Sequence, residues 1–354
     1  MAAVTQRRPV VVRGALPGEG PAIAELWREL WDAHEGWGGY PGSRDPRAYV
    51  DLGARLDQDA SARRGQPILG RHIHVIATVS DGLAGQVEGW VERHGVRPET
   101  PLTCEVRSLI VTSWARGEGV GRALLEGLAV AGRRFGRESA LVLGAEVLEK
   151  NPAHGFYARL GYRPVSYSLA IPADDRVFVP APIDSPAPGR YTARLGEPRD
   201  ALAVAVLDAA LAERRRADGD PRFDPPRAVD AASVDAIATQ LRESERQRGS
   251  GASFELVSAD SQGHVRAIAT FAQSTLDPPF KAGHRAVLGR FAVDPACDAA
   301  PLVAPLIALG QRLAGRARAR FVELTDITAP GTPLYEAAIK AGATTWSRIV
   351  TARG

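Results

Sequence analysis

The sequence predicts a mixed α/β protein made of two tandem domains. Its 354 residues exceed what one typical core takes up and suit two domains of ordinary size. Apolar residues make up 45% and charged residues 24%, close to the averages of globular proteins, so wholesale disorder is not expected. Strand-like runs alternate with helical periodicity, and the order of elements in the first half recurs in the second.

The first half predicts a complete α/β module. In chain order we expect a strand at 9–15, helices at 19–37 and near 48–56, strands at 71–79, 83–95 and 101–113, a helix at 120–136, a strand at 139–148, a short helix at 153–161 and a strand at 163–171. In the helix at 120–136 the expected buried stripe is Leu124, Leu128, Ala131 and Phe135. Repeated proline marks residues 172–190 as a stiff linker between a first domain at 1–171 and a second at 191–354.

The second half repeats the order of elements of the first. Residues 191–208 echo residues 10–27, and residues 289–317 echo residues 108–136. In the second copy the helix carries its expected buried positions at Leu302, Leu306, Leu309 and Leu313. We infer an internal duplication, with chance similarity of two α/β domains as the alternative.

The charge and the cysteine content limit which cellular compartment and which binding partners are expected. The formal net charge is +3 and nearly every base is Arg, but no basic run carries interleaved aromatic residues, so charge alone gives no support for nucleic-acid binding. We see no signal peptide and no apolar run of membrane length, so no membrane association is expected. Cys104 and Cys297 indicate no disulfide framework, and the histidines lack metal-ligand spacing. The expected compartment is therefore the cytoplasm, with no metal site.

The glycine-rich turn "RGEGVG" at 116–121 has features of a binding site. It connects an apolar strand to a helix, where the first helical amides have no internal partners and the helix dipole is positive. Arg116 and Arg122 flank this turn and suit the oxygens of a diphosphate. Neither G-x-G-x-x-G after a first strand nor G-x-x-x-x-G-K-[ST] fits the residues present. A plain tight turn with a glycine cap is the alternative.

In this order of elements, the turn resembles the Q/R-x-x-G-x-G/A pyrophosphate loop of the GNAT superfamily of acyl-CoA-dependent N-acyltransferases. The resemblance covers most of residues 10–171 and implies a mixed, mostly antiparallel sheet flanked by helices in each domain. It implies acetyl-CoA, or another acyl-CoA, as the cofactor. The implied cofactor-binding residues in the turn are Arg116, Gly117, Glu118, Gly119, Val120, Gly121 and Arg122.

A second block, "NPAHGFYARLGY" at 151–162, is similar to the family's N-x-x-A-x-x-F/L-Y-x-x-L-G-F pattern. The resemblance implies that Asn151 contacts the pantetheine arm and that Tyr157 protonates the departing thiolate. Asn151 stands six residues before Tyr157, where the family pattern usually has seven, so Asn151 is the less secure ligand. For Tyr157 the alternative is a half-buried core residue. The resemblance also implies that the backbone of Leu109, Ile110 and Val111 pairs with the pantetheine amides.

Acyl transfer to an amine needs a neutral amine, so a group must accept its proton. Glu105 is the nearest carboxylate on the strand that leads to the turn, and strand alternation predicts that it shares a face with Arg107, Leu109 and Val111. An ion pair between Glu105 and Arg107 is the alternative role for this carboxylate. No cysteine nucleophile is required, and Cys104 is better explained as a core residue.

The family lines its acceptor pocket with the first helices and the loop between them. In this sequence that region, with one residue of the third strand, gives the candidates Trp31, His34, Glu35, Trp37 and Trp90. Aromatic rings with acids suit a cationic, partly apolar amine. The alternative for Trp31 is the buried stripe of its helix, which it would share with Trp27 one turn earlier.

The second half has lost the features of the turn. In the alignment of the two halves, Arg116 meets Asp298, Gly119 meets Pro301 and Gly121 meets Val303. We therefore expect a degenerate copy that does not bind CoA, in which Tyr335 is structural and which supports the first domain, completes the cleft or forms a homodimer surface.

The leading function is an acetyl-CoA-dependent N-acetyltransferase that acts on a small-molecule amine such as an antibiotic, a metabolite or a biosynthetic intermediate. One alternative is a GNAT-fold transferase that uses aminoacyl-tRNA, against which the intact turn counts because tRNA offers no such diphosphate. Another is a non-catalytic acyl-CoA sensor.

Overall fold

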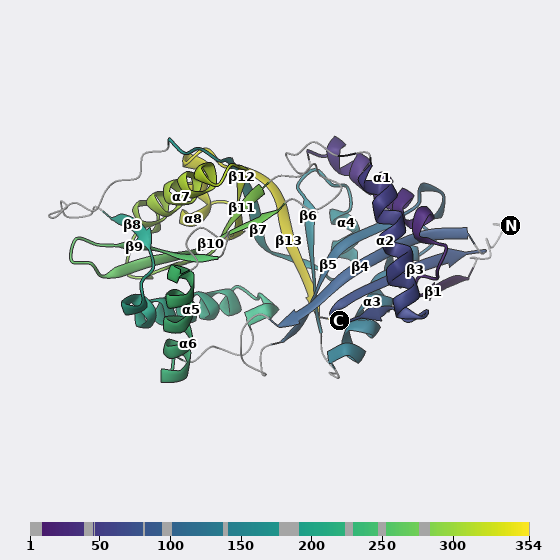
Figure 1. Cartoon of the computed structure of the whole chain (residues 1–354), viewed down its shortest axis with the longest axis horizontal. Coiled ribbons are helices and arrows are strands. Elements are labelled where there is room, and N and C mark those ends of the chain that lie inside the picture. Colours follow the sequence, from purple (N-terminus) through teal and green to yellow (C-terminus); the bar gives the residue numbers. More distant parts are fainter. Residues whose placement is uncertain are drawn as a thin grey trace. The chain divides into compact units, whose positions relative to one another are not determined.

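The computed structural model describes residues 9–38, 45, 47–80, 82–93, 101–136, 141–176, 191–223, 229–246, 253–275 and 284–353. The chain divides into two compact units (Figure 1). Unit 2 comprises Pro164–Asp277 and Lys281–Ile349, and unit 1 consists mainly of Met1–Arg163 and Val350–Gly354. Most of the expected linker at 172–190 lies outside the described residues.

Unit 1 begins with a strand and two helices and continues with the strands of its sheet. Its elements are β1 (Val10–Arg13), α1 (Gly20–Gly36), α2 (Ala48–Arg63), β2 (Ile68–Leu69), β3 (His72–Val79), β4 (Gly82–Arg93), β5 (Leu102–Val111), the 3-10 turn η1 (Ser113–Ala115), α3 (Val120–Gly136), β6 (Val142–Leu148) and α4 (His154–Arg159). The strand order is β1-β3-β4-β5-β6, with β2 beside β3. Neighbours are antiparallel except for the parallel β5–β6 pair.

Unit 2 repeats this order of elements. It contains β7 (Arg163–Pro172), β8 (Thr192–Leu195), η2 (Pro198–Asp200), α5 (Ala201–Ala217), η3 (Pro221–Phe223), α6 (Ala231–Arg246), β9 (Phe254–Ala259), β10 (Val265–Thr275), β11 (His284–Val293), α7 (Ala299–Arg316), β12 (Ala319–Ile327), α8 (Pro333–Lys340) and most of β13 (Thr344–Arg353). Its strand order is β13-β7-β12-β11-β10-β9-β8. The β11–β12 pair is parallel, as β5–β6 is in unit 1.

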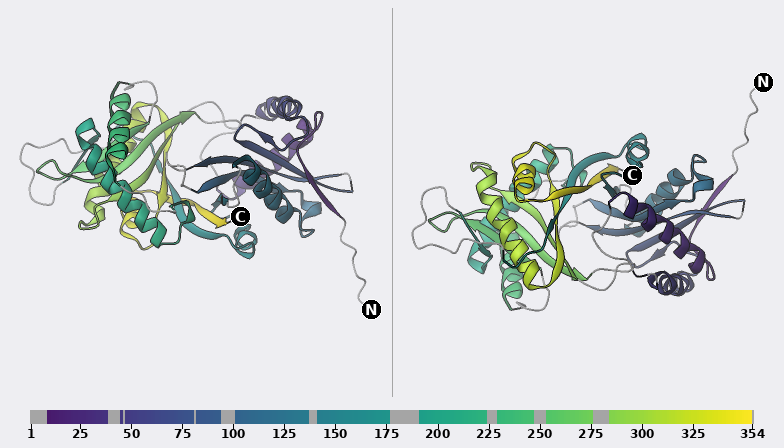
Figure 2. Two further views of the ribbon diagram at one scale, coloured as in Figure 1. Left: turned by 90° about the horizontal axis from the view of Figure 1, so that it is seen from below. Right: turned by 90° about the horizontal axis from the view of Figure 1, so that it is seen from above.

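Each unit has helices on both faces of its sheet. In unit 1, α1 and α2 pack on one face around Ile23, Leu56 and Ile76, and α3 packs on the other face. In unit 2, α5 packs on Val257 and Ile268 while α7 lies on the opposite face (Figure 2). Burial of one apolar stripe per helix drives both arrangements.

The predicted helical stripes are confirmed at most positions. Leu124, Leu128 and Ala131 are at most 2% exposed, and Leu302 and Leu306 are fully buried. Leu309 and Leu313 are partly buried against the same core. Phe135 was expected to be buried, but it is 38% exposed. At this end of α3 the residue that approaches the core is Gly136, whose missing side chain leaves room for Leu102.

The boundary between the units differs from the expected one at residue 171. The strand β7 was expected to complete the first domain, yet it pairs with β12 from Phe321↔Pro172 to Ile327↔Tyr167 in unit 2. Conversely Val350, near the end of the chain, is 5% exposed in the core of unit 1. Each unit therefore takes part of a strand from the other half of the sequence.

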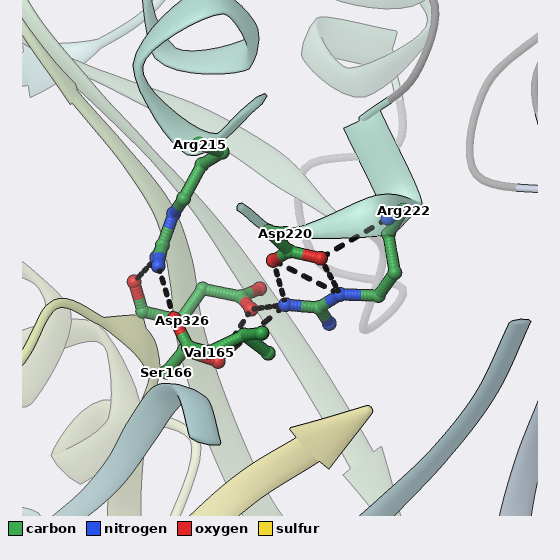
Figure 3. Close-up of polar contacts among 6 residues, drawn as sticks. All are labelled: Val165, Ser166, Arg215, Asp220, Arg222 and Asp326. Carbon is green, nitrogen blue, oxygen red and sulfur yellow. Dashed lines mark hydrogen bonds and ion pairs between the residues drawn. The ribbon is translucent and has the colours of Figure 1, made fainter. Parts of the chain in front are cut away.

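A buried polar cluster secures β7 in unit 2 (Figure 3). Arg215 of α5, 2% exposed, donates from Nη1 to the carbonyl of Val165 at 3.0 Å and from Nη2 to the carbonyl of Asp326. Arg222 forms ion pairs with Asp220 at 2.8 Å and with Asp326 at 3.3 Å. Arg222 thus faces two carboxylates and Arg215 two backbone carbonyls, so each guanidinium has acceptors that offset its removal from water.

None of the helices in the described ranges is both long and apolar enough to cross a membrane.

Candidate functional site

The turn at 116–121 presents open backbone at the start of α3. Gly117 and Gly119 have φ of +86° and +88°, a region that L side chains rarely adopt. The first hydrogen bond of the helix runs from Ala123 N to Gly119 O at 3.1 Å. The N–H groups of residues 120–122 precede that bond, and Gly117, Glu118, Gly119 and Arg122 are exposed. The turn can therefore receive an anion in the way the sequence predicts.

Arg116 is folded back against the strand that precedes the turn. Its Nε donates to the carbonyl of Val111 at 3.2 Å, and its Nη2 reaches Glu29 of α1 at 3.4 Å. Both side chains of this ion pair are largely exposed, so the pair contributes little stability. A phosphate group can replace Glu29 as the partner of this guanidinium at small cost.

Gly121 is required for close packing and not for its φ angle. A Cβ at this position would lie 3.0 Å from the ring of Phe156 in α4. The bare backbone lets α4 approach the first turn of α3, so that two segments predicted to bind one ligand lie side by side.

The strand β5 is open along one edge just before the turn. Its parallel pairing with β6 runs from Thr103↔Val142 to Val106↔Ala145. In the described chain, Leu109–Val111 continue beyond that pairing with β4 alone as partner, as in Val87↔Leu109 and Gly85↔Val111. This free edge lies where the resemblance requires the backbone of Leu109, Ile110 and Val111 to pair with the pantetheine amides.

The predicted common face of Glu105 with Leu109 and Val111 is wrong. Between β4 and β5 the register shifts, from Glu88↔Ser108 to Gly89↔Val106, so Arg107 is an extra residue. Because of this bulge, Leu109 and Val111 pack into the same core as Cys104, the neighbour of Glu105. Glu105 lies on the opposite face, directly across from Trp90.

Glu105 is engaged in the ion pair that was weighed as its alternative role. Its Oε2 lies 3.0 Å from Arg107 Nη2, and the two side chains are 41% and 51% exposed. Cys104 is fully buried, and burial raises the pKa of its thiol to about 12. Its interpretation as a core residue is confirmed.

Tyr157 lies in α4 with its ring packed edge-on against Phe156 and Tyr162, both at 5.2 Å. The residue is 7% exposed, and burial raises the pKa of its hydroxyl, which therefore stays protonated at neutral pH. Asn151 uses its side-chain oxygen locally, because Oδ1 accepts from Ala153 N at 2.8 Å at the start of α4.

The aromatic candidates fall into two groups. At the end of α1, the ring of His34 contacts Trp31 at 5.1 Å and Trp37 at 5.6 Å, while Glu35 is exposed. Burial lowers the pKa of His34 to about 4, so this ring is neutral at pH 7. Trp31 also stacks on Trp27 at 6.4 Å.

The second group lies on the sheet. Trp90 of β4 is 38% exposed, with its ring 6.3 Å from that of His72 in β3. No described contact joins Trp90 to the aromatic group of α1.

In unit 2, side chains occupy the position that corresponds to the turn at 116–121. Asp298 is the N-cap of α7 and accepts from Ala300 N at 3.2 Å, which occupies an amide that α3 leaves open. Val303 is fully buried, and the hydroxyl of Tyr335 is hydrogen-bonded to Thr345 Oγ1 at 2.6 Å. These contacts fit the expectation of a degenerate copy.

The comparison with protein families decides the assignment of unit 1. Residues 70–164, which hold the free edge of β5, the turn and α4, match the model described as an acetyltransferase (GNAT) domain. The chain contains a GNAT domain. No curated protein sequence matches the chain significantly.

Solved structures share this fold over nearly the whole chain. A GCN5-related N-acetyltransferase from Sphaerobacter thermophilus is 20% identical with a TM-score of 0.56, and the match covers 98% of this chain and 95% of that one. A glucosamine N-acetyltransferase region of a fungal multi-domain enzyme is 12% identical with a TM-score of 0.54, over 98% of this chain and 38% of that one. A tandem GNAT protein from the clavulanic acid biosynthesis pathway is 18% identical with a TM-score of 0.49, over 98% of both chains. The match to the Sphaerobacter thermophilus structure, with the repeated order of elements, confirms the prediction of two tandem, mostly antiparallel GNAT-like domains.

The sequence analysis missed a buried polar group close to the GNAT domain's open strand. Its buried members are Arg63, His74, Gln86 and Glu88, and the half-buried His72 joins them. The sequence does contain a signal: polar residues alternate with apolar ones at His72 and His74 in one strand and at Gln86 and Glu88 in the next. Such alternation is typical of a strand with one face in solvent, and only the position of the helices shows that this face is covered.

Proposed function

We propose that the GNAT domain transfers an acyl group, acetyl in the simplest case, from acyl-CoA to the amine of a small molecule. The observation that carries this proposal is the continuity of the free edge at Leu109–Val111 with the open turn at 116–121. A diphosphate at the turn and an amide-bearing arm along the strand edge would occupy the two features in sequence.

The residues present fit CoA in charge and in shape. Two arginines, Arg116 and Arg122, flank exposed amides at the positive end of α3, and Gly117 and Gly119 supply backbone without side chains. When bound, the thioester would supply an acyl carbon that is activated for attack. In the degenerate turn of unit 2, Asp298 stands where the first turn has a cation, which supports one CoA-binding site per chain.

Tyr157 supports the catalytic form of this proposal over a sensor. Its hydroxyl is protonated at neutral pH and belongs to the helix that packs on Gly121. We assign it the proton that the departing thiolate takes up, since a thiol has an ordinary pKa near ~8.5.

For the acceptor, we propose a small, partly apolar amine. The neutral His34 between Trp31 and Trp37 offers aromatic surface, and Trp90 offers a second exposed ring. Such rings stack on apolar groups and attract a cation.

The test combines ligand-induced stabilisation with product release. Acetyl-CoA and CoA are expected to raise the unfolding temperature. A ligand that binds only the native state, present at a concentration 100 times its Kd, adds about 2.7 kcal/mol to the free energy of unfolding. Bulk tRNA is expected to leave the temperature unchanged. Thiol release from acetyl-CoA with a panel of amines then separates a catalyst from a sensor. Stabilisation by tRNA alone would contradict the proposal.

A further inference from the structure

The face of the unit 1 sheet under α1 and α2 carries a line of buried polar residues. Glu88 of β4 lies directly across from His74 of β3 on one side and from Ser108 of β5 on the other. Glu88 is 9% exposed, His74 1% and Ser108 4%. A carboxylate at such a position destabilises the fold unless donors face it.

The donor that faces Glu88 is His72, whose ring is in turn held by Arg63. Arg63 of α2, 3% exposed, lies with Nη2 2.8 Å from His72 Nδ1. A guanidinium can only donate, so Nδ1 is the acceptor and the ring proton of neutral His72 is on Nε2. That nitrogen lies 3.5 Å from Glu88 Oε2. The tautomer of His72 is thus fixed so that its N–H faces the carboxylate.

The charge state of Glu88 follows from its surroundings. Burial by itself would raise its pKa, but the hydrogen bond from His72 and the charge of Arg55 in α2 act against burial, and the pKa of Glu88 lies below its ordinary value. Burial lowers the pKa of His74, which is therefore neutral at pH 7. Asp59 of α2 faces Arg63 and balances its charge. Glu88 is accordingly a carboxylate at neutral pH.

Polar side chains continue on both sides of Glu88 in the described part of the chain. Gln86 Nε2 donates to Ser108 Oγ at 3.0 Å. His74 Nε2 and Gln86 Oε1 are buried and make no hydrogen bond of regular geometry, but the two side chains interact with each other. Ser108 directly precedes the free edge at Leu109–Val111, so this line of polar side chains borders the place assigned to the arm of the acyl donor.

We propose that Glu88, and not Glu105, accepts the proton that the acceptor amine loses, with Arg63 and His72 as positioning residues that hold the Glu88 carboxylate. The inference rests on the proposed acyl transfer. In the reaction the amine nitrogen bonds to the acyl carbon, the carbon–sulfur bond breaks, and the sulfur leaves with the electron pair and takes a proton. The nitrogen gives up one proton, which Glu88 receives either directly or through one water.

The experiment compares Glu88→Gln with the matched control Glu105→Gln in the full chain. Thiol release with the best amine is followed from about pH 3 to 9, so that the window includes the lowered pKa of Glu88, and stabilisation by acetyl-CoA reports an intact fold and donor site at each pH. Glu88→Gln is expected to lower kcat by about 10²–10⁴-fold and to abolish the acid limb of the profile, while Glu105→Gln stays within about twofold of wild type. If Glu88→Gln turns over with the wild-type profile, the inference is overturned and the proposed function stands. If the wild-type chain releases no thiol with any amine, both are overturned.

The positioning residues have a readout of their own. His72→Phe removes the N–H that faces Glu88, so the pKa of the carboxyl should rise and the acid limb should move to higher pH. Arg63→Met should move it in the same direction, and His72→Gln, which keeps an N–H donor, should restore it toward the wild-type position. A fall in kcat without any displacement of the limb would refute this role and leave a purely structural one.

Discussion

Arg194 and Asp200 form a two-pronged ion pair, with Nη1 to Oδ2 at 2.6 Å and Nη2 to Oδ1 at 2.9 Å. Arg13 and Glu19 form the same pair at the same spacing in unit 1, at 2.8 and 2.6 Å. In each half the acid also accepts a backbone N–H from three residues earlier, at 2.8 Å in unit 2 and 2.7 Å in unit 1. A shared motif at matching positions of the echoed segments supports the internal duplication.

The two copies of this ion pair differ in burial, so their loss should differ in cost. The Asp200 side chain is 6% exposed and that of Glu19 is 26% exposed. Asp200→Ala leaves a poorly solvated guanidinium and should lower the free energy of unfolding by about 3 kcal/mol, whereas Glu19→Ala should cost about 1 kcal/mol. Urea unfolding of both variants measures the difference. Equal losses would mean that burial does not set the strength of the motif.

The C-terminal residues are expected to stabilise the first unit. Removal of the chain after Ile349 takes Val350 out of the unit 1 core. Amide hydrogen exchange should then accelerate in β6 and α3, although more than two hundred residues separate them from the deletion in sequence, while α7 in unit 2 serves as the internal control. Unchanged hydrogen-exchange rates in unit 1 would contradict the conclusion that the residues after Ile349 belong to the core of unit 1.

Local signals in the sequence were enough for the elements and for the turn. The apolar stripe at Leu124 and Leu128 and the glycines before it predict α3 and its open N-terminus, because both depend on residues close in sequence. The unit boundary was placed at residue 171 because nothing local distinguishes a strand that pairs with β6 from one that pairs with β12.

The arrangement of side chains around β5 was harder to predict from the sequence. One extra residue at Arg107 reverses the faces of Leu109 and Val111, and a period-two pattern contains no sign of such a bulge. Glu88 was not among the residues that the sequence pattern singles out, because its polar neighbours come from other elements. The network around Glu88 depends on Arg63, which is brought onto the sheet by α2 from outside the strands.

Protonation of His34 should destabilise the protein at low pH. Its pKa falls from near ~6.5 in the unfolded chain to about 4 in the fold, because burial disfavours the charged ring. The unfolded state therefore binds more protons between these values, so this contribution is present above about pH 6.5 and is lost as the pH falls toward 4. It amounts to at most about 3 kcal/mol. His34→Phe should flatten the dependence of the unfolding free energy on pH over this window, and Glu35→Gln, its exposed neighbour, should not.

Tyr157→Phe should impair turnover without loss of fold. Removal of the hydroxyl takes away the donor assigned to the thiolate, so kcat should fall by at least about 10²-fold while acetyl-CoA still raises the unfolding temperature. Tyr162→Phe is the matched control, since its ring lies 5.2 Å away and its hydroxyl is buried without a partner among the described residues. Equal effects of the two substitutions on kcat would remove Tyr157 from the mechanism.

Calorimetric titration of the full chain with acetyl-CoA tests the central claim most directly, because it counts sites as well as measuring their affinity. We expect one site per chain, weakened at least about tenfold, or about 1.4 kcal/mol, by Gly121→Val or by Arg116→Glu, and unchanged by Asp298→Ala in unit 2. Two sites per chain, or a single site that survives both changes in the turn and disappears with Asp298→Ala, would contradict the assignment of the diphosphate to residues 116–122.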